Sequence, residues 1–323
     1  MRGKIGIREG KRIEEWDGNR SGGIAQHSSQ NSNLSPQISN LKTQNPNLIP
    51  QASALKTQIS HHERNELMDI KILVAAHKNY WMPADDVYMP LQVGAEGKEL
   101  LGYTPDNTGD NISAKNPNYC ELTGLYWAWK NLECQYIGLC HYRRYFGRKV
   151  HTKDIEKKKK AIFHREDYER LLKKYDVIIP VKRNYYIETV RSQYEHAHYK
   201  KDLDEVEKII SERYPGYSDA FIRVMNRRKL HILNMFVMKK SLFDEYCTWL
   251  FDILFELGKR TDMTGYDTYE SRLFGFMSER LFNVWLERQN LKKCEVPVVF
   301  LENIDWFMKI REFLERKFLG KKL

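Results

Sequence analysis

KILVAA, at residues 71–76, is a short apolar run that leads directly into His77, Lys78 and Asn79. Runs of this length without polar alternation are typical of strands that are buried on both faces, as in a parallel sheet. Comparable runs recur at 136–139, 177–180, 232–238 and 296–301. The sequence therefore predicts several buried strands distributed over most of the chain.

Segments with helical periodicity lie between these runs. One begins with Asn116 as N-cap and Pro117 at the first helical position, and its apolar side chains then recur at helical spacing from 122 to 129. Further helical patterns cover 202–213, 243–257 and 272–288. Strands that alternate with helices predict an α/β fold with a mostly parallel sheet, in which ligands bind at the carboxyl ends of the strands.

Composition narrows the classes of protein. The 323 residues carry a net charge of +10, which favours an anionic partner. The five cysteines are scattered and form no CxxC pair, which is typical of reduced thiols in a cytoplasmic protein. No apolar run approaches the roughly 18 residues that span a bilayer. Motifs for dinucleotide binding, P-loop nucleotide binding and zinc or serine hydrolysis are missing.

Residues 1–67 differ in composition from the rest of the chain. The part from 21 to 60 is rich in Ser, Asn, Gln and Pro and cannot bury enough apolar surface to offset the entropy of ordering. We expect a disordered low-complexity tail over 1–67, with Met68 as an alternative start of the protein. The folded domain is expected over 69–305, followed by a basic helix or tail over 306–323.

The strongest chemical pattern is YIGLCHYRRYF at 136–146, in which an apolar strand leads into His141, Arg143 and Arg144. Two guanidinium groups at a strand end can hold a diphosphate by bidentate hydrogen bonds, with aromatic rings beside a base or sugar. A structural arginine pair that binds carboxylates fits the same residues equally well. The residues alone leave both interpretations open.

A polar loop at 103–113 offers further side chains that could hold sugar hydroxyls. It contains Asp106, Asp110, Asn111 and Ser113, and it leads to a helix N-terminus, which favours anions. The same residue types dominate ordinary turns, so a purely structural loop is the alternative.

One D-x-D pair, Asp202 and Asp204, lies just after His196 and His198. Many nucleotide-sugar transferases bind Mn²⁺ or Mg²⁺ with such a pair directly after a strand. Here the pair opens a helix, where acidic side chains are expected from the helix dipole alone. Metal binding by this pair is therefore the less favoured interpretation.

Two carboxylates near the end of the chain are candidates for a general base that deprotonates an acceptor hydroxyl. Glu279 lies within a strongly amphipathic helix, and Asp267 lies in the polar loop before it. A salt bridge between Glu279 and Arg280 on a solvated face is the structural alternative.

Taken in order, these segments resemble a family of polysaccharide-synthesis glycosyltransferases from bacterial capsule and exopolysaccharide clusters, long catalogued as a domain of unknown function. The similarity covers about residues 69–305, with HYRRYF at 141–146 as its hallmark. The other matching segments are AHK at 76–78, PLQVG at 90–94, LGY at 101–103, DNTGDNIS at 106–113, NPNYCELT at 116–123, YWAWKN at 126–131 and FMSERL at 276–281.

The resemblance implies a GT-A-like fold and a nucleotide-sugar donor, with a UDP-sugar and a galactose form favoured. It also implies which residues bind the donor. They are Ala76, His77 and Lys78 at the nucleobase, Asp110, Asn111 and Ser113 at the ribose or donor sugar, and His141, Arg143 and Arg144 at the diphosphate. These last three replace the metal-binding acids of other GT-A enzymes, which implies that side chains, rather than Mn²⁺ or Mg²⁺, neutralise the leaving group.

The predicted reaction is attack of an acceptor hydroxyl on the donor's anomeric carbon, with Glu279 or Asp267 as base. The expected acceptor is a lipid-linked saccharide at the inner face of the membrane, where basic residues favour an anionic surface. A nucleic-acid-binding protein is disfavoured because the basic residues are interleaved with acidic ones. A non-catalytic sugar-binding subunit is the other alternative.

Overall fold

The computed structural model describes residues 67–302. The chain divides into two units, and the second begins at Met68. The tail predicted over 1–67, apart from Leu67, and the basic segment predicted over 306–323 lie outside the described residues. Within the described range, no helix is both long enough and apolar enough to cross a membrane.

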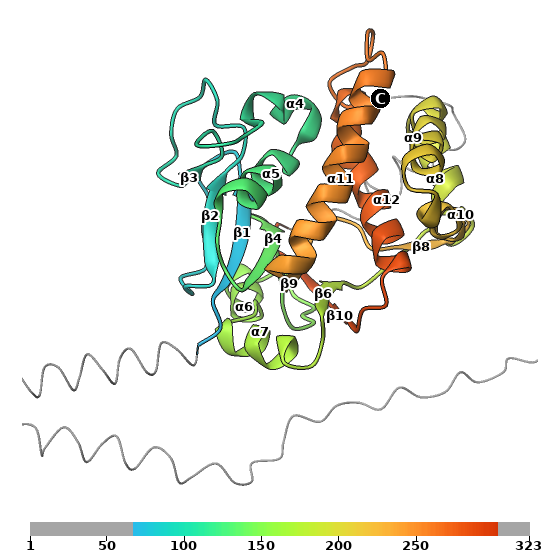
Figure 1. Cartoon of the computed structure of the whole chain (residues 1–323). Coiled ribbons are helices and arrows are strands. Elements are labelled where there is room, and N and C mark those ends of the chain that lie inside the picture. The colour runs from blue at the N-terminus through green and yellow to red at the C-terminus, as the bar shows by residue number, and fades with distance from the viewer. Residues whose placement is uncertain (1–66, 303–323) are drawn as a thin grey trace, which may run out of the picture. The chain divides into compact units, whose positions relative to one another are not determined.

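A mixed sheet forms the centre of the second unit (Figure 1). Its strands in the described range are β1 (Ile70–Ala76), β2 (Tyr88–Gln92), β3 (Thr104–Pro105), β4 (Tyr136–His141), β5 (Arg144–Phe146), β6 (Val177–Pro180), β9 (Phe236–Lys239), β10 (Lys293–Val296) and β11 (Val298–Phe300). The strand order is β10-β6-β9-β4-β1-β2-β3, with β5 paired to β4 and β11. Along the main row only β9 runs antiparallel to its neighbours. The predicted α/β fold with a mostly parallel sheet is confirmed.

Three predicted apolar runs coincide with β1, β4 and β6, whereas two are shorter than expected. The run at 296–301 is divided because Pro297, which has no N–H, separates β10 from β11. In the run at 232–238, the strand begins only at Phe236. Leu233 and Asn234 precede it with φ of 82° and 51°, in the left-handed region that a strand excludes.

Helices connect the strands and cover the sheet. Their bounds are α4 (Asn116–Tyr119), α5 (Leu122–Asn131), α6 (Ile155–Lys160), α7 (Arg165–Leu172), α8 (Val190–Ala197), α9 (Lys200–Arg213), α10 (Ser218–Met225), α11 (Lys240–Arg260) and α12 (Leu273–Arg288). Short 3₁₀ turns lie at η2 (Ser113–Lys115), η3 (Pro215–Tyr217) and η4 (Glu270–Arg272). The helix predicted from Asn116 is interrupted at Cys120, whose φ of 53° ends α4 before α5 begins.

Two hydrophobic cores lie on opposite faces of the sheet. Alternate residues of β1 point to opposite sides, so Leu73 joins one core and Ile72 the other. The first core is completed by α5, α11, α12 and the helices α8 to α10, and the second by α7 and by residues 161–163, which follow α6 (Figure 1). A small separate sheet pairs β7 (Arg183–Asn184) with β8 (Lys229–Leu230).

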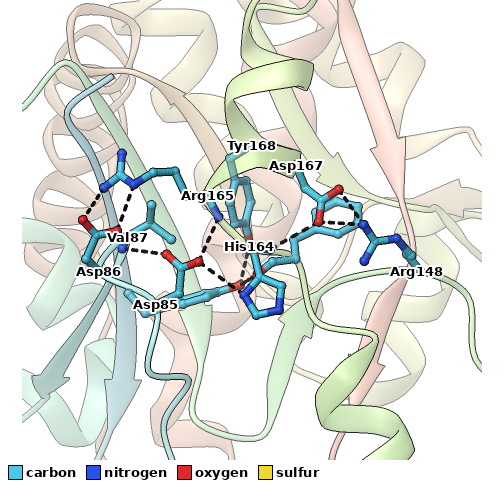
Figure 2. A network of polar contacts seen from close by, with 10 residues as sticks. Asp85, Asp86, Val87, Arg148, His164, Arg165, Asp167 and Tyr168 are labelled. Atoms are coloured by element: carbon cyan, nitrogen blue, oxygen red, sulfur yellow. Dashed lines mark hydrogen bonds and ion pairs between the residues drawn. The ribbon is translucent and has the colours of Figure 1, made fainter. Parts of the chain in front are cut away.

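A polar network joins α7 to the loop between β1 and β2 (Figure 2). The carboxylate of Asp85 accepts hydrogen bonds from the N–H groups of Val87 and Arg165 at 3.1 and 3.0 Å. Arg165 in turn donates to Asp86 at 2.9 Å, and on the other side of the helix start Arg148 donates to Asp167 at 2.8 Å. The donors and acceptors of this network pair with one another, and together they hold the start of α7 against the loop before β2.

Candidate active site

A cavity of about 710 Å³ opens at the carboxyl ends of β1 and β4, where the fold class places ligands. Its walls come from these strands, from the segment between α4 and α5, and from the first half of α12. The ionisable side chains that line it are His77, Lys98, Glu121, His141, Arg143, Arg144, Arg272 and Glu279. Four lysines and arginines face two carboxylates, so the cavity favours an anion.

Arg143 and Arg144 follow β4 and differ in their partners. The guanidinium of Arg143 donates to Glu302 at 2.6 Å and lies 4.8 Å from the centre of the Tyr142 ring. The side chain of Arg144 forms no hydrogen bond or ion pair with any residue in the range 67–302. Burial, together with repulsion by Arg143, lowers the pKa of Arg144, while the nearby carboxylates oppose that shift. Within residues 67–302, Arg144 is thus a half-buried cation that lines the cavity without a hydrogen-bonding partner.

His141, the last residue of β4, is held as a neutral donor. Its Nε2–H donates to the carbonyl oxygen of Leu233 at 2.7 Å, and burial lowers the pKa of the imidazole. This hydrogen bond fixes the ring at the base of the cavity, beside the arginine pair.

The two carboxylates of the cavity are held by the same turn, Leu233–Asn234. Glu279 accepts the Leu233 N–H at 2.8 Å, and Glu121 accepts from the Asn234 amide at 2.8 Å. Both turn residues have positive φ, and the Asn234 amide oxygen has no partner among the described atoms. Such local strain persists only where surrounding contacts enforce it. We name this segment the 233–234 turn.

Burial raises the pKa of Glu279, although the neighbouring Arg280 and the Leu233 N–H oppose the shift. The second carboxylate oxygen lies 3.4 Å from the Arg280 guanidinium. The contact with Arg280 expected in the structural alternative is therefore present, but Arg280 is buried rather than on a solvated face, and the carboxylate lines the cavity.

Of the three residues predicted at the nucleobase, His77 lines the cavity. Its ring packs edge-on against Tyr142 at 5.3 Å, and burial, reinforced by Arg143, lowers its pKa. The ammonium of Lys78 lies 5.8 Å from the same Tyr142 ring. Ala76 is fully buried in β1 and pairs with Gln92, so it contributes only backbone near the site.

Asp110, Asn111 and Ser113 do not line the cavity as the structure describes it. Asp110 accepts from the Tyr126 hydroxyl at 3.1 Å, and Asn111 accepts the Ser113 N–H at 3.1 Å. Ser113 is buried and donates to the carboxylate of Asp106. These bonds are the turn chemistry expected as the alternative. The contact of these residues with a donor sugar stays a prediction.

Asp106 itself has a definite structural role. It is fully buried and accepts the N–H groups of Gly94 and Ala95 at 2.8 and 3.0 Å. Gly94 has φ of 64°, and a Cβ there would meet the side chain of Asn116, a cavity residue, at 2.3 Å. Asp106 and Gly94 thus allow the loop after β2 to pack directly against the cavity wall.

Asp267, the other candidate base, lies outside the cavity. Its exposed carboxylate accepts the N–H groups of Tyr269 and Glu270, each at 2.8 Å, and so holds the start of η4. Its geometry supports a role in organising the loop before α12.

The D-x-D residues point to different partners. Asp202 is buried and accepts from the Tyr266 hydroxyl at 2.8 Å, whereas Asp204 pairs with Lys200 and Arg191. His196 pairs with Glu188 and His198 with Glu270. Among residues 67–302 no group of three or more His, Cys, Asp or Glu side chains is arranged to hold a metal ion. The residues of the alternative metal site are therefore not brought together.

Among the histidine, lysine, arginine and glutamate side chains that line the cavity, three were not predicted from the sequence: Lys98, Glu121 and Arg272. Glu121 directly precedes α5, where an acidic residue is expected from the helix dipole, so its position carries no separate signal. Arg272 ends η4 and donates to the Cys120 sulfur at 3.3 Å. Only the folded chain brings these residues beside β4.

A sequence-family model described as a domain of unknown function, DUF4422, matches residues 71–290. The chain belongs to the DUF4422 family. Every residue that lines the cavity lies within the matched DUF4422 region. The predicted relation to a long-catalogued domain of unknown function is confirmed at this level.

Among solved structures, the DUF4422 chain is similar to the apo structure of the bifunctional glycosyltransferase WbbM. The two are 32% identical with a TM-score of 0.68, and the match covers 73% of this chain and 46% of that one. The chain therefore matches less than half the length of WbbM. A search of functionally curated proteins finds no significant match.

Proposed function

We propose that this DUF4422 protein is a glycosyltransferase that uses a nucleotide-sugar donor. The observation that carries the proposal is Arg144, a half-buried guanidinium beside Arg143 that has no acidic partner in residues 67–302. Such a group favours an anion with several oxygens, as in a diphosphate. The similarity to WbbM, a bifunctional glycosyltransferase, supports a sugar as the transferred group.

The reaction follows from the chemistry of the cavity walls. An acceptor hydroxyl attacks the anomeric carbon, the bond from that carbon to the diphosphate oxygen breaks, and Glu279 takes the hydroxyl proton. The raised pKa of Glu279 suits a general base that works near neutral pH. Arg143 and Arg144 stabilise the negative charge that develops on the leaving diphosphate, which is commonly the largest contribution to catalysis.

The finer assignments belong to the same proposal. We assign a UDP-sugar, with a galactose form favoured, and a GT-A-like arrangement in which His77 and Lys78 flank the nucleobase beside Tyr142. The acceptor is a lipid-linked saccharide of capsule or exopolysaccharide synthesis, at the cytoplasmic face of the membrane. Neutralisation by arginines makes a divalent ion dispensable.

Arg144→Ala tests the proposal. UDP should bind the variant more weakly by about 1.5–3 kcal/mol, because a hydrogen bond to a charged group is lost. Arg144→Lys should restore little, since an ammonium cannot form the bidentate contact. Isothermal titration with UDP measures both, and Arg228→Ala, an exposed arginine outside the cavity, serves as the matched control.

A turnover assay with candidate UDP-sugars completes the test. Turnover should survive excess EDTA; loss of activity that Mn²⁺ restores would contradict the metal-free part. Unchanged UDP affinity in folded Arg144→Ala would reassign the arginine to structure. Tight donor binding without transfer or donor hydrolysis would indicate the non-catalytic sugar-binding alternative.

A further inference from the structure

Large apolar side chains project into solvent on both sides of β7. Tyr186 is 75% exposed, Ile187 is 66% exposed, and Val181 is 53% exposed. Single exposed apolar residues are common, but three within seven residues form a local concentration that is typical of a contact surface.

The backbone holds these side chains outward. Tyr186 has φ of 58°, an uncommon conformation for an aromatic residue. Its N–H donates to the Asn184 side chain at 2.9 Å, and the Ile187 N–H donates to the Tyr185 carbonyl at 2.8 Å. The Tyr185 N–H in turn donates to the Arg228 carbonyl at 2.8 Å, which ties the loop to the chain entering β8. Defined hydrogen bonds therefore hold the loop in the conformation that exposes Tyr186 and Ile187.

Cations lie on and beside the two strands next to this loop. Arg183 lies on β7, and Arg228 and Lys229 lie at the start of β8, all three exposed. Within the part of the chain that the structure describes, none of the three forms an ion pair with an acidic residue. Their charge is therefore available to an external anion.

The acidic residues nearby are already paired. Glu295 binds Lys182 at 3.0 Å, and Glu287 binds Arg227 at 2.7 Å. Burial, together with repulsion from Lys182 and Arg227, lowers the pKa of Lys293, which shows that cations crowd here. We name this region the hairpin surface. It consists of Val181, Lys182, Arg183, Tyr186, Ile187, Arg228 and Lys229.

We propose that the hairpin surface docks on an anionic lipid bilayer. Tyrosine and isoleucine side chains enter the boundary between head groups and acyl chains, and flanking lysines and arginines bind lipid phosphates. The charge complementarity selects this partner, because three cations without an acidic partner in residues 67–302 lie beside exposed apolar side chains.

Docking would also bear on the cavity, although it does not depend on the proposed function. β8 ends at Leu230, and Leu233, three residues later, lines the cavity. The chain that leaves the hairpin surface through β8 thus reaches, within three residues, the 233–234 turn that holds Glu279.

Sedimentation of the full chain with vesicles tests the proposal. The protein should bind phosphatidylcholine vesicles that contain phosphatidylglycerol, bind phosphatidylcholine alone weakly, and dissociate as salt is raised. The triple variant Arg183→Gln, Arg228→Gln, Lys229→Gln should bind about a hundredfold more weakly, because each cation near an anionic bilayer contributes roughly fivefold. The matched control, Lys153→Gln, Lys157→Gln, Lys160→Gln, removes the same charge from exposed lysines at α6.

A second variant tests the apolar part. Tyr186→Asn keeps a residue that tolerates positive φ, and combined with Ile187→Ser it should weaken vesicle binding at least about tenfold. An equal loss of vesicle binding in the hairpin triple variant and in the α6 control variant would overturn the proposal. Undiminished vesicle binding by the Tyr186→Asn, Ile187→Ser variant would also overturn it. A wild-type dimer in solution that is lost in the Tyr186→Asn, Ile187→Ser variant would overturn the proposal as well, because the hairpin surface would then bind a second copy of the chain. UDP titration of the same variants should be unchanged, which separates this test from that of the proposed function.

Discussion

Glu279 is subject to opposing influences, and their balance matters for its role. Burial favours the protonated acid, whereas the Leu233 N–H and Arg280 favour the carboxylate, and the outcome is a raised pKa. A folded-state pKa above the unfolded value means that ionisation at neutral pH opposes folding. The cost is absent below the unfolded pKa and grows as the pH rises through the folded one. Glu279 therefore reduces stability at the pH where a base is needed.

Glu279→Gln should accordingly separate activity from stability. Transfer should fall by about 10²–10⁴, the range for loss of a general base. The melting temperature should rise relative to wild type near neutral pH, and the difference should vanish well below the unfolded-state pKa of about 4.3, where the wild-type acid is protonated in both states. Melting curves across pH, with a transfer assay, measure both effects.

Asp267→Asn provides the comparison at the residue scale. Asp267 holds η4 from outside the cavity, so its variant should retain transfer. Loss of transfer in Asp267→Asn, with activity preserved in Glu279→Gln, would exchange the two assignments.

Among single residues, the sequence could indicate the arginines because they directly follow a clear strand, and Glu279 because it is a carboxylate in an amphipathic helix that follows a polar loop. It could not indicate Glu121, since an acid at a helix start is ordinary. Nor could it separate Asp110 and Ser113, which hold a loop, from residues that face a ligand. Residue type specifies what a side chain can bind, but only the packed chain specifies which way it points.

Among the elements, the connection between β8 and β9 shows most clearly how a short segment organises the site. The apolar pattern of 232–238 predicts one strand, because pattern alone does not report φ. The 233–234 turn instead takes left-handed geometry, and its groups hold His141, Glu121 and Glu279. The strand is shortened where the site needs irregular backbone.

Asn234→Gly and Asn234→Ala form a matched pair that tests this turn. Both remove the hydrogen bond to Glu121, so transfer should fall in both. Glycine accepts the positive φ, whereas alanine adds a cost of about 1–2 kcal/mol for the left-handed conformation. Urea unfolding should rank wild type above Gly and Gly above Ala. Equal stability of the two variants would contradict the assignment of strain to residue 234.

At the scale of the whole molecule, the α/β class follows from the alternation of apolar runs and helical patterns. The position of β9 does not, because an apolar run carries no sign of its direction or neighbours. β9 lies antiparallel between β4 and β6, and it joins strands that are distant in sequence. The separation of β10 from β11 could have been predicted from the sequence, since Pro297 has no N–H to donate to a neighbouring strand.

Within residues 67–302, the side chains that form the two hydrophobic cores belong to the unit that begins at Met68. A protein that starts at Met68 should therefore keep the melting temperature and the UDP affinity of the full chain. Differential scanning calorimetry with and without UDP measures both. A melting transition that broadens or falls by several degrees would show that residues 1–67 contribute to folding.

Because Arg143 already binds the carboxylate of Glu302, an anion that binds Arg143 has to replace that carboxylate. The Arg143–Glu302 contact is 2.6 Å long, and a ligand with one negative charge gains little by exchanging one singly charged partner of Arg143 for another. A ligand with two or more negative charges gains by binding Arg143 and Arg144 together, because Arg144 has no acidic partner in residues 67–302. If the cavity binds the proposed donor, we therefore expect the pair to favour a diphosphate over singly charged metabolites.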